Sequence, residues 1–164
     1  MGCFVLGARG EVRDVQQFIR RLRQVAQDLG LEGQAFDADL VFGAEHLLVA
    51  WDHAERAFSR GSNVASDRMV EVLLFAAGER QIAKALEKMG VKEGQDHMVL
   101  LLAGEGDPDR LLTKLGLERD DRLLEGRVDM LPAFGFTKEE MATVDTDRVF
   151  DLVLERVALV GLLR

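Results

Sequence analysis

The sequence predicts an α/β fold in which a small mixed or antiparallel sheet of about four strands is packed with several helices. Residues 97–103 include the unbroken apolar run Met98 to Leu102 between two glycines, which is typical of a central strand. Residues 12–29 and 43–58 have apolar side chains at three- and four-residue spacing, which indicates amphipathic helices. Strands and helices alternate too irregularly for a doubly wound parallel sheet.

The N-terminal part is expected to form a strand, a helix, a second strand and a second helix. Cys3 to Leu6 is a short apolar strand followed by a glycine turn. The helix at 12–29 ends at Gly30, which is a typical C-terminal cap. Gln34 to Ala38 is the second candidate strand, ahead of the helix at 43–58.

The most informative segment is 66–94, which changes character at Gly78. Residues 69–77 are apolar at almost every position, which predicts a helix buried on all sides, with Ser66 as its N-cap. After the glycine, apolar residues recur at helical spacing beneath a charged face: Ile82, Ala85, Leu86 and Met89.

The start of this second helix is the first candidate binding site. The pattern places Glu79, Arg80 and Gln81 at its exposed N-terminal end, with Lys84 one turn further on. Free backbone N–H groups and long donor side chains at a helix N-terminus favour an anionic or carbonyl-rich partner, and phosphate is one such group. The opposite interpretation is a solvated helix end whose charges pair with neighbouring acids.

The C-terminal third is expected to contain short elements before a final helix. Asp107-Pro108 suits the start of a short helix that ends at Gly116, and 121–125 is a candidate edge strand. Thr137 and Glu140 have capping-box spacing, and Asp145 or Thr146 opens the last helix, which runs to Leu163. No repeat or linker is found, so a single domain over 1–164 is expected.

Composition limits the function. The net charge of −8 and the pI near 4.9 argue against coating nucleic acid by bulk charge, so any RNA contact must be local. Cys3 is the only cysteine, which suits a reducing cytoplasm and excludes a cysteine-based zinc site. Leu6 stands where a myristoylation signal needs serine or threonine, and the first apolar run is too short for a signal peptide or membrane span.

Other candidate chemistry has simpler explanations. His46 and His53 are seven residues apart on one helix, about 10 Å, so they cannot share a metal ion. Residues 104–106 form a glycine turn without the third glycine of a dinucleotide loop, and no G-x-S-x-G motif surrounds a serine. We therefore expect no metal, no cofactor and no catalytic site.

Two further features have competing interpretations. Arg20, Arg21 and Arg23 on the first helix are either a solvated face or a phosphate contact, the latter only if they lie near Arg80 and Lys84. The final helix has three charged residues between 149 and 163, so it either threads the core or presents surplus apolar surface to a protein partner.

The chain resembles the TPRKB family, the small kinase-binding subunit of the KEOPS complex, and is most similar to its archaeal members. The resemblance rests on EVLLFAAGERQIAKAL at 71–86, where an apolar helix and a small-small-glycine break precede Arg-Gln-Ile. MGVKEG at 89–94, DDRLLE at 120–125 and ERVAL at 155–159 add to it, so the similarity spans most of the chain.

The resemblance implies a non-catalytic regulatory subunit in the assembly that installs threonylcarbamoyl on tRNA adenosine. In that family the subunit binds the small atypical kinase-ATPase of the complex and recruits tRNA through its 3′ CCA end. By position, the tRNA-binding residues would be Gly78, Arg80, Gln81 and Lys84, and the kinase-binding residues Leu152, Leu159, Val160 and Leu163. Glu79 is an acidic residue within the first set.

Two alternatives from other classes stay open at this stage. One is a small-molecule-binding regulator or enzyme with a pocket near Gly104 to Asp107. The other is a self-associating structural protein in which the last helix pairs with a second copy.

Overall fold

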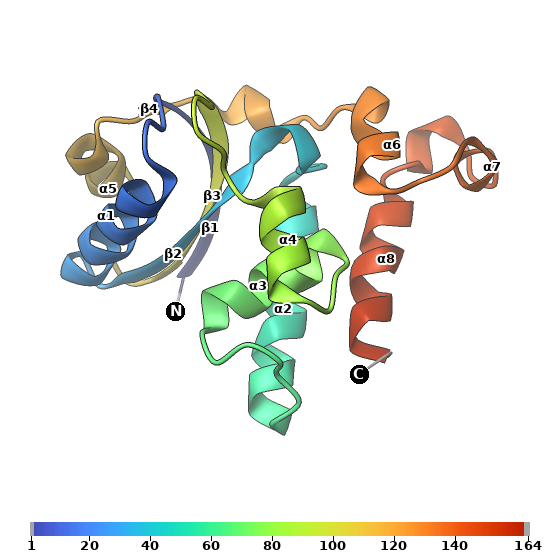
Figure 1. The fold of residues 1–164 in the computed structure, drawn as a ribbon, viewed down its shortest axis with the longest axis horizontal. Helices are drawn as coiled ribbons and strands as arrows, with labels where there is room; N and C mark the ends of the chain where they lie inside the picture. The colour runs from blue at the N-terminus through green and yellow to red at the C-terminus, as the bar shows by residue number, and fades with distance from the viewer. Residues whose placement is uncertain (1, 163–164) are drawn as a thin grey trace.

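The computed structural model describes residues 2–162, which form a four-stranded antiparallel sheet in the order β2-β3-β1-β4 (Figure 1). The long strands β1 (Gly2–Arg9) and β3 (His97–Gly104) lie side by side at the centre. β2 (Leu31–Asp37) and the two-residue β4 (Glu118–Arg119) form the edges. The predicted fold class is confirmed.

Eight α-helices and four 3₁₀ helices complete the described part of the chain. The α-helices are α1 (Val15–Asp28), α2 (Ala44–Arg60), α3 (Arg68–Ala77), α4 (Ile82–Met89), α5 (Pro108–Leu115), α6 (Leu131–Phe134), α7 (Lys138–Met141) and α8 (Asp151–Leu162). The 3₁₀ helices are η1 (Ala38–Leu40), η2 (Asp121–Leu124), η3 (Val128–Met130) and η4 (Thr146–Arg148). Within residues 2–162, no helix is both long and apolar enough to cross a bilayer.

The sheet separates two hydrophobic cores. α1 and α5 cover one face, and the larger group of helices that includes α2, α3 and α8 covers the other (Figure 1). Alternate residues of β3 enter the two cores: Met98 and Leu100 pack with α1 and α5, whereas Val99 and Leu101 pack with the larger group. A strand covered on both faces is apolar throughout, which explains its unbroken run.

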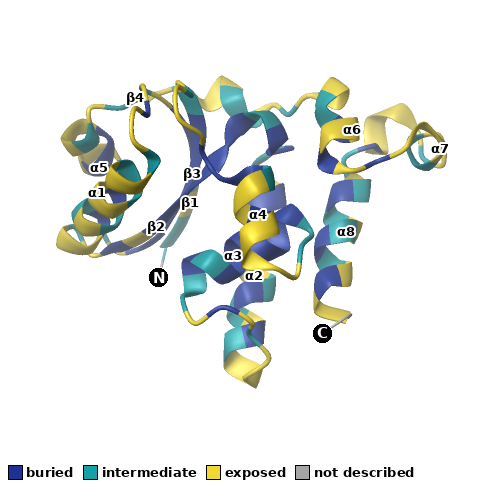
Figure 2. Ribbon diagram, viewed as in Figure 1, coloured by how far each residue is buried: buried dark blue, intermediate teal, exposed yellow. Residues whose placement is uncertain are grey.

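α3 is the centre of the larger core, as predicted from its composition. Residues 71–77 are all buried, and Figure 2 shows α3 as a largely buried element among its neighbours. Glu71 is 0% exposed and accepts the backbone N–H of Val64 at 3.0 Å, which satisfies its carboxylate inside the protein. The N-cap is Asp67 rather than the predicted Ser66, since the Asp67 side chain accepts from Val70 N–H.

The predicted strand at 121–125 is wrong. The edge strand lies just before it, at Glu118–Arg119, and pairs with Ala8 and Arg9 of β1. Asp120 then accepts the backbone N–H of Arg122 through its side chain and caps η2. This cap turns the chain into a 3₁₀ helix and ends the sheet pairing.

Two helix predictions are also corrected. The last helix begins at Asp151 rather than at Asp145 or Thr146, because 146–148 form the separate turn η4. The predicted end at Leu163 lies outside the described residues. In α4 only Ala85 and Met89 are buried, whereas Ile82 and Leu86 are 39% and 48% exposed.

Candidate functional site

Gly78 makes the predicted break between α3 and α4. It adopts the left-handed conformation, with φ of 68°, and caps α3 through its N–H on Phe75 O, while Glu79 N–H bonds to Leu74 O. A glycine is favoured here because other residues adopt this conformation at a cost. The chain therefore reverses at the surface, and residues 80–84 are exposed.

The residues around this break line a hollow of about 300 Å³. Its lining consists of Gly78, Glu79, Arg80, Gln81 and Lys84, which we call the turn surface. Four of these five are the predicted tRNA-binding residues, so the structure brings that set together. Glu79 is the fifth, and it places one carboxylate beside two cationic side chains.

The N-terminus of α4 opens at the turn surface. Gln81 is the N-cap residue but makes no side-chain capping bond. The first N–H groups of a helix have no partner within the helix, so those of α4 carry partial positive charge beside Arg80 and Lys84. The arrangement suits an acceptor such as a phosphate or carbonyl oxygen.

Lys88 of α4 contacts the residue that precedes the turn. Its Nζ donates to the carbonyl oxygen of Ala77 at 2.6 Å and lies 3.8 Å from the centre of the Phe134 ring. Burial lowers the pKa of Lys88 to about 8, and the positive charge of Arg156 acts in the same direction, while Glu79 opposes it. The lysine thus satisfies one of the final carbonyls of α3.

Arg156 of α8 packs against Gly78 from the other side. A Cβ atom placed on Gly78 would lie 2.8 Å from Cγ of Arg156, so the arginine stem fills the space that a side chain would need. The guanidinium lies 4.4 Å from the centre of the Phe136 ring and donates to Glu140 Oε2 at 3.1 Å. The turn is therefore in contact with α8.

The helix α8 has a buried side and an exposed side. Val153, Val157 and Val160 face the core, and Val160 is only 3% exposed. This residue was expected on the partner-facing surface, but its burial gives it a packing role in the described chain. The three- and four-residue spacing of these valines explains their common face.

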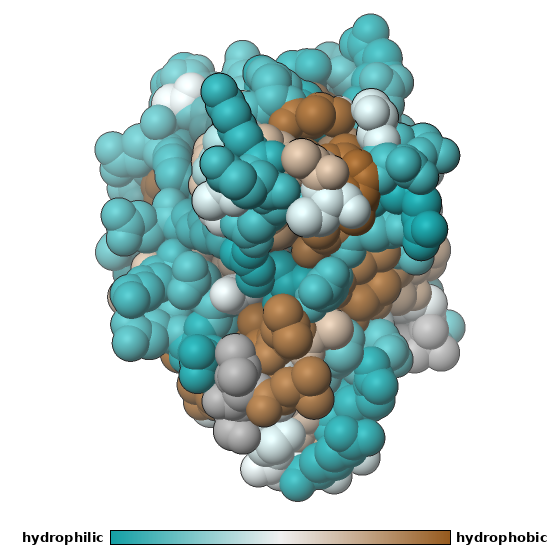
Figure 3. Space-filling model, turned by 90° about the vertical axis from the view of Figure 1, so that its right-hand side faces the viewer, coloured by the Kyte–Doolittle hydropathy of each residue, from teal (hydrophilic) through white to brown (hydrophobic). Residues whose placement is uncertain are grey.

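The exposed side of α8 carries apolar residues. Leu159 is 39% and Leu162 is 79% exposed, while Leu152 is partly buried; we call these three the α8 face. Figure 3 looks onto this side of the molecule and shows hydrophobic side chains exposed among hydrophilic ones. The predicted Leu163 lies outside the described residues.

The arginine cluster of α1 is not part of the turn surface. Arg23 pairs with Asp67 at 2.7 Å, at the N-terminal end of α3, and Arg21 donates to Lys114 O of α5. Gly78 is at the opposite end of the ten-residue α3, about 15 Å away. Arg20 is exposed on the same helix. The condition for a shared phosphate surface is therefore not met.

The histidines predicted not to share a metal occupy different environments. His46 is buried, accepts the Phe42 N–H at Nδ1, and donates from Nε2 to Ala76 O at 2.8 Å. His53 stacks on Phe75 with ring centres 5.4 Å apart, and burial lowers its pKa.

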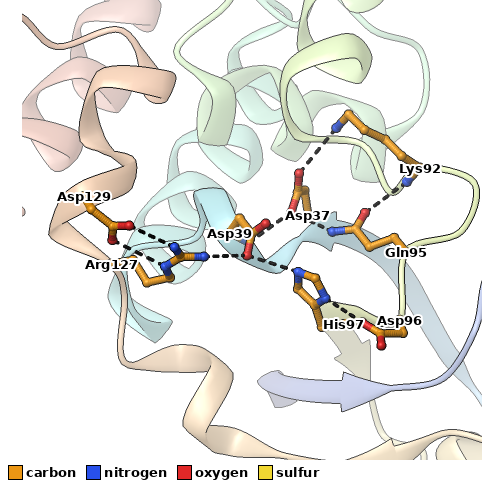
Figure 4. A network of polar contacts seen from close by, with 8 residues as sticks. All are labelled: Asp37, Asp39, Lys92, Gln95, Asp96, His97, Arg127 and Asp129. Atoms are coloured by element: carbon orange, nitrogen blue, oxygen red, sulfur yellow. Dashed lines mark hydrogen bonds and ion pairs between the residues drawn. The ribbon is translucent and has the colours of Figure 1, made fainter.

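A polar network lies at the start of β3, and no sequence pattern indicated it (Figure 4). His97 contacts Asp96 at 2.8 Å and Asp39 at 3.0 Å, and Asp39 also accepts from Arg127. Asp37 accepts from Gln95 and Lys92. Ligand atoms of Asp37, Asp39 and His97 lie within 4.8 Å of one another, a spacing compatible with a metal ion, but these atoms already have protein partners.

The glycine turn at 104–106 has a packing function. A Cβ on Gly104 would lie 2.3 Å from Gly30 O, and one on Gly106 would lie 2.0 Å from Leu29 O. Asp107 uses its side chain to cap α5. Close backbone approach and capping therefore account for the residues of this motif.

Comparison with known proteins decides the family. Residues 11–160 match the family described as "Kinase binding protein CGI-121". The chain belongs to this family. The resemblance to TPRKB proteins is thereby confirmed. A protein of Methanocaldococcus jannaschii named "Regulatory protein Cgi121" is 29% identical over 142 residues, which cover 87% of this chain and 92% of that protein.

Proposed function

We propose that this CGI-121 family member is a non-catalytic regulatory subunit of the KEOPS complex, which makes threonylcarbamoyladenosine in tRNA. In this proposal α8 binds the small atypical kinase-ATPase and the turn surface receives the 3′ CCA end of tRNA. The observation that carries the proposal is the hollow of about 300 Å³ whose lining unites Gly78, Arg80, Gln81 and Lys84.

The RNA half of the proposal is compatible with an acidic protein. Single-stranded RNA needs only a few phosphate contacts, together with stacking or hydrogen bonds to base edges. Arg80, Lys84 and the uncapped N-terminus of α4 supply such donors locally, on a chain whose net charge is −8. Glu79 limits the positive field, which favours recognition of a short RNA end over binding along a helix.

The kinase half is supported by the family description and by the α8 face. A leucine that is 79% exposed at Leu162, next to a 39% exposed Leu159, is apolar surface that a protein partner would cover. Such surface contributes to affinity when desolvated in an interface.

Two binding measurements test the two halves separately. Full-length tRNA and the same tRNA lacking its 3′ CCA are titrated against the protein, and the truncated tRNA is expected to bind at least about tenfold more weakly. Equal affinities would contradict CCA recognition. The purified kinase is titrated in parallel, with light scattering of the isolated chain to detect self-association. A stable homodimer that excludes the kinase would instead favour the self-associating alternative.

A further inference from the structure

We propose that Arg156 is a positioning residue that couples the α8 face to the turn surface, so that kinase bound on α8 increases affinity for RNA at the turn. This inference rests on the proposed function and adds a regulatory link between its two surfaces.

The first contact of the link is between Arg156 and Gly78. The Cγ atom of the arginine lies 2.8 Å, and its Cδ atom 3.6 Å, from the position of a Cβ on Gly78. Gly78 is the residue at which the chain reverses, since its φ of 68° sets the direction of Glu79 and Arg80. A shift of the arginine stem therefore changes the packing of the residue that orients the turn.

The far end of the Arg156 side chain has two partners. Its guanidinium lies over Phe136 and pairs with Glu140 of α7, and the Phe134 and Phe136 rings stack with centres 5.6 Å apart. These contacts hold the stem between α8 and the turn. The side chain is still 30% exposed, so a neighbour that covers it reduces the freedom that remains.

Lys88 provides a second connection between the same elements. It bonds to Ala77 O, the residue before Gly78, and lies against Phe134 of α6. The turn is therefore held by a lysine from α4 and an arginine from α8, and both side chains reach the same pair of phenylalanines.

A partner bound to the α8 face would also lie over Arg156. Leu152 and Leu159 are four residues before and three residues after Arg156, so the three side chains share one side of the helix. The Arg156 side chain is 30% exposed and remains open to a partner. A kinase surface that covers both leucines therefore also covers the arginine.

The expected sign of the coupling follows from the loss of conformational freedom on binding. A partner that immobilises Arg156 also restrains the Gly78 turn, so RNA would pay less of the ordering cost when it binds. Coupling in binding is reciprocal, which means that RNA must raise the affinity for kinase by the same factor. Coupling between sites is typically 5- to 150-fold, and we expect at least about fivefold here.

The test measures this factor in the intact protein. A short single-stranded RNA ending in CCA is titrated with and without saturating kinase, for the wild type and for Arg156→Ala, Arg156→Lys and Arg148→Ala. Arg156→Ala removes the stem and the guanidinium. It should bring the ratio of the RNA affinities with and without kinase to about one. Arg156→Lys keeps the methylenes against Gly78 and should restore part of it. Arg148, 71% exposed and paired with Asp151, is the matched control and should keep the full ratio.

A second readout does not need either ligand. Amide chemical shifts of residues 78–84 are compared in the isolated wild-type protein and the Arg156 variants, with circular dichroism to confirm that each is folded. We expect Arg156→Ala to shift these resonances and Arg156→Lys to shift them less. Unmoved resonances, or an unchanged affinity ratio in Arg156→Ala, would overturn the coupling while leaving the two binding sites intact. Failure of the wild type to bind RNA or kinase at all would instead overturn the proposed function, and the coupling with it.

Discussion

His46 and Ala76 join two helices of the larger core: the imidazole Nε2 donates to the Ala76 carbonyl oxygen at 2.8 Å. The Nδ1 atom accepts a backbone N–H, so the ring must be the neutral Nε2–H tautomer. Burial lowers the pKa of His46 to about 4. Protonation would remove the acceptor at Nδ1 and leave a charge in the core.

The first prediction is a loss of stability in mild acid that originates at His46. The unfolded chain binds a proton near pH 6.5 and the folded chain only near pH 4, so stability is complete above the first value and falls between the two. A pKa difference of this size corresponds to about 3 kcal/mol. Urea unfolding at several pH values should show this slope in the wild type and a shallower one in His46→Gln. Equal slopes would contradict it.

The second prediction has the opposite sign and concerns His97. Its hydrogen bond to Asp96 raises the pKa, with Asp39 acting in the same direction. Its contribution to stability is therefore complete below the unfolded value of 6.5 and is lost as pH rises through the raised folded value. Unfolding of the wild type and His97→Gln should differ most in mild acid and converge at alkaline pH. A difference that grows with pH would contradict this.

The third prediction separates backbone strain from packing at Gly78. Gly78→Ala forces alanine into the left-handed region, at about 1–2 kcal/mol, and brings its Cβ against Arg156. Gly61→Ala is the matched control, because Gly61 caps α2 with φ of 71° but has no atom within 4 Å of a Cβ. Chemical unfolding should show the larger loss for Gly78→Ala. Equal losses would mean that the Arg156 contact does not matter.

The fourth prediction tests the turn surface electrostatically. Arg80→Glu should weaken tRNA binding and reduce the slope of log affinity against log salt by about one, because a phosphate contact releases a counterion. Arg13→Glu is the control, since the Arg13 side chain is 85% exposed on the loop before α1. Fluorescence anisotropy over a range of salt concentrations measures both. If both variants have the same effect, only net charge is being detected.

Much of the fold was predictable because its strongest signals are local. Periodicity and caps identify α1, α2 and β3, and the apolar composition of α3 predicts its burial. The prediction for α4 was wrong at Ile82 and Leu86, because periodicity reveals an apolar face but not whether another element covers it. The edge strand β4 lies before the predicted segment 121–125, because the side-chain cap at Asp120 competes with strand pairing there.

The candidate site was predictable to the same extent. The turn surface is contiguous in sequence, so a glycine break and its neighbours suffice to identify it. Arg156 is 78 residues from Gly78 (156 − 78), and Arg127 is 88 residues from Asp39, so no local pattern indicates either contact. The two residues of each pair meet only because the fold places α8 and the 3₁₀ segments beside them.

The last prediction concerns adjacent residues on α8 with opposite environments. Leu159→Asp changes a 39% exposed side chain and should alter stability by about 0.5 kcal/mol or less. It should nevertheless weaken kinase binding by about 2 kcal/mol or more, because an interface that covers the leucine would have to desolvate the new charge. Calorimetric titration with the kinase and thermal unfolding of the free protein measure the two effects.

Two controls decide whether the effect belongs to the α8 face. Leu48→Asp places the same charge on α2 at a leucine of matching exposure, 40%, and should leave kinase binding intact. Val160→Asp introduces a charge at a 3% exposed position and should unfold the protein, since the core provides no partner for it. If Leu159→Asp instead unfolds the protein as Val160→Asp does, then α8 acts as a core helix and the kinase must bind elsewhere.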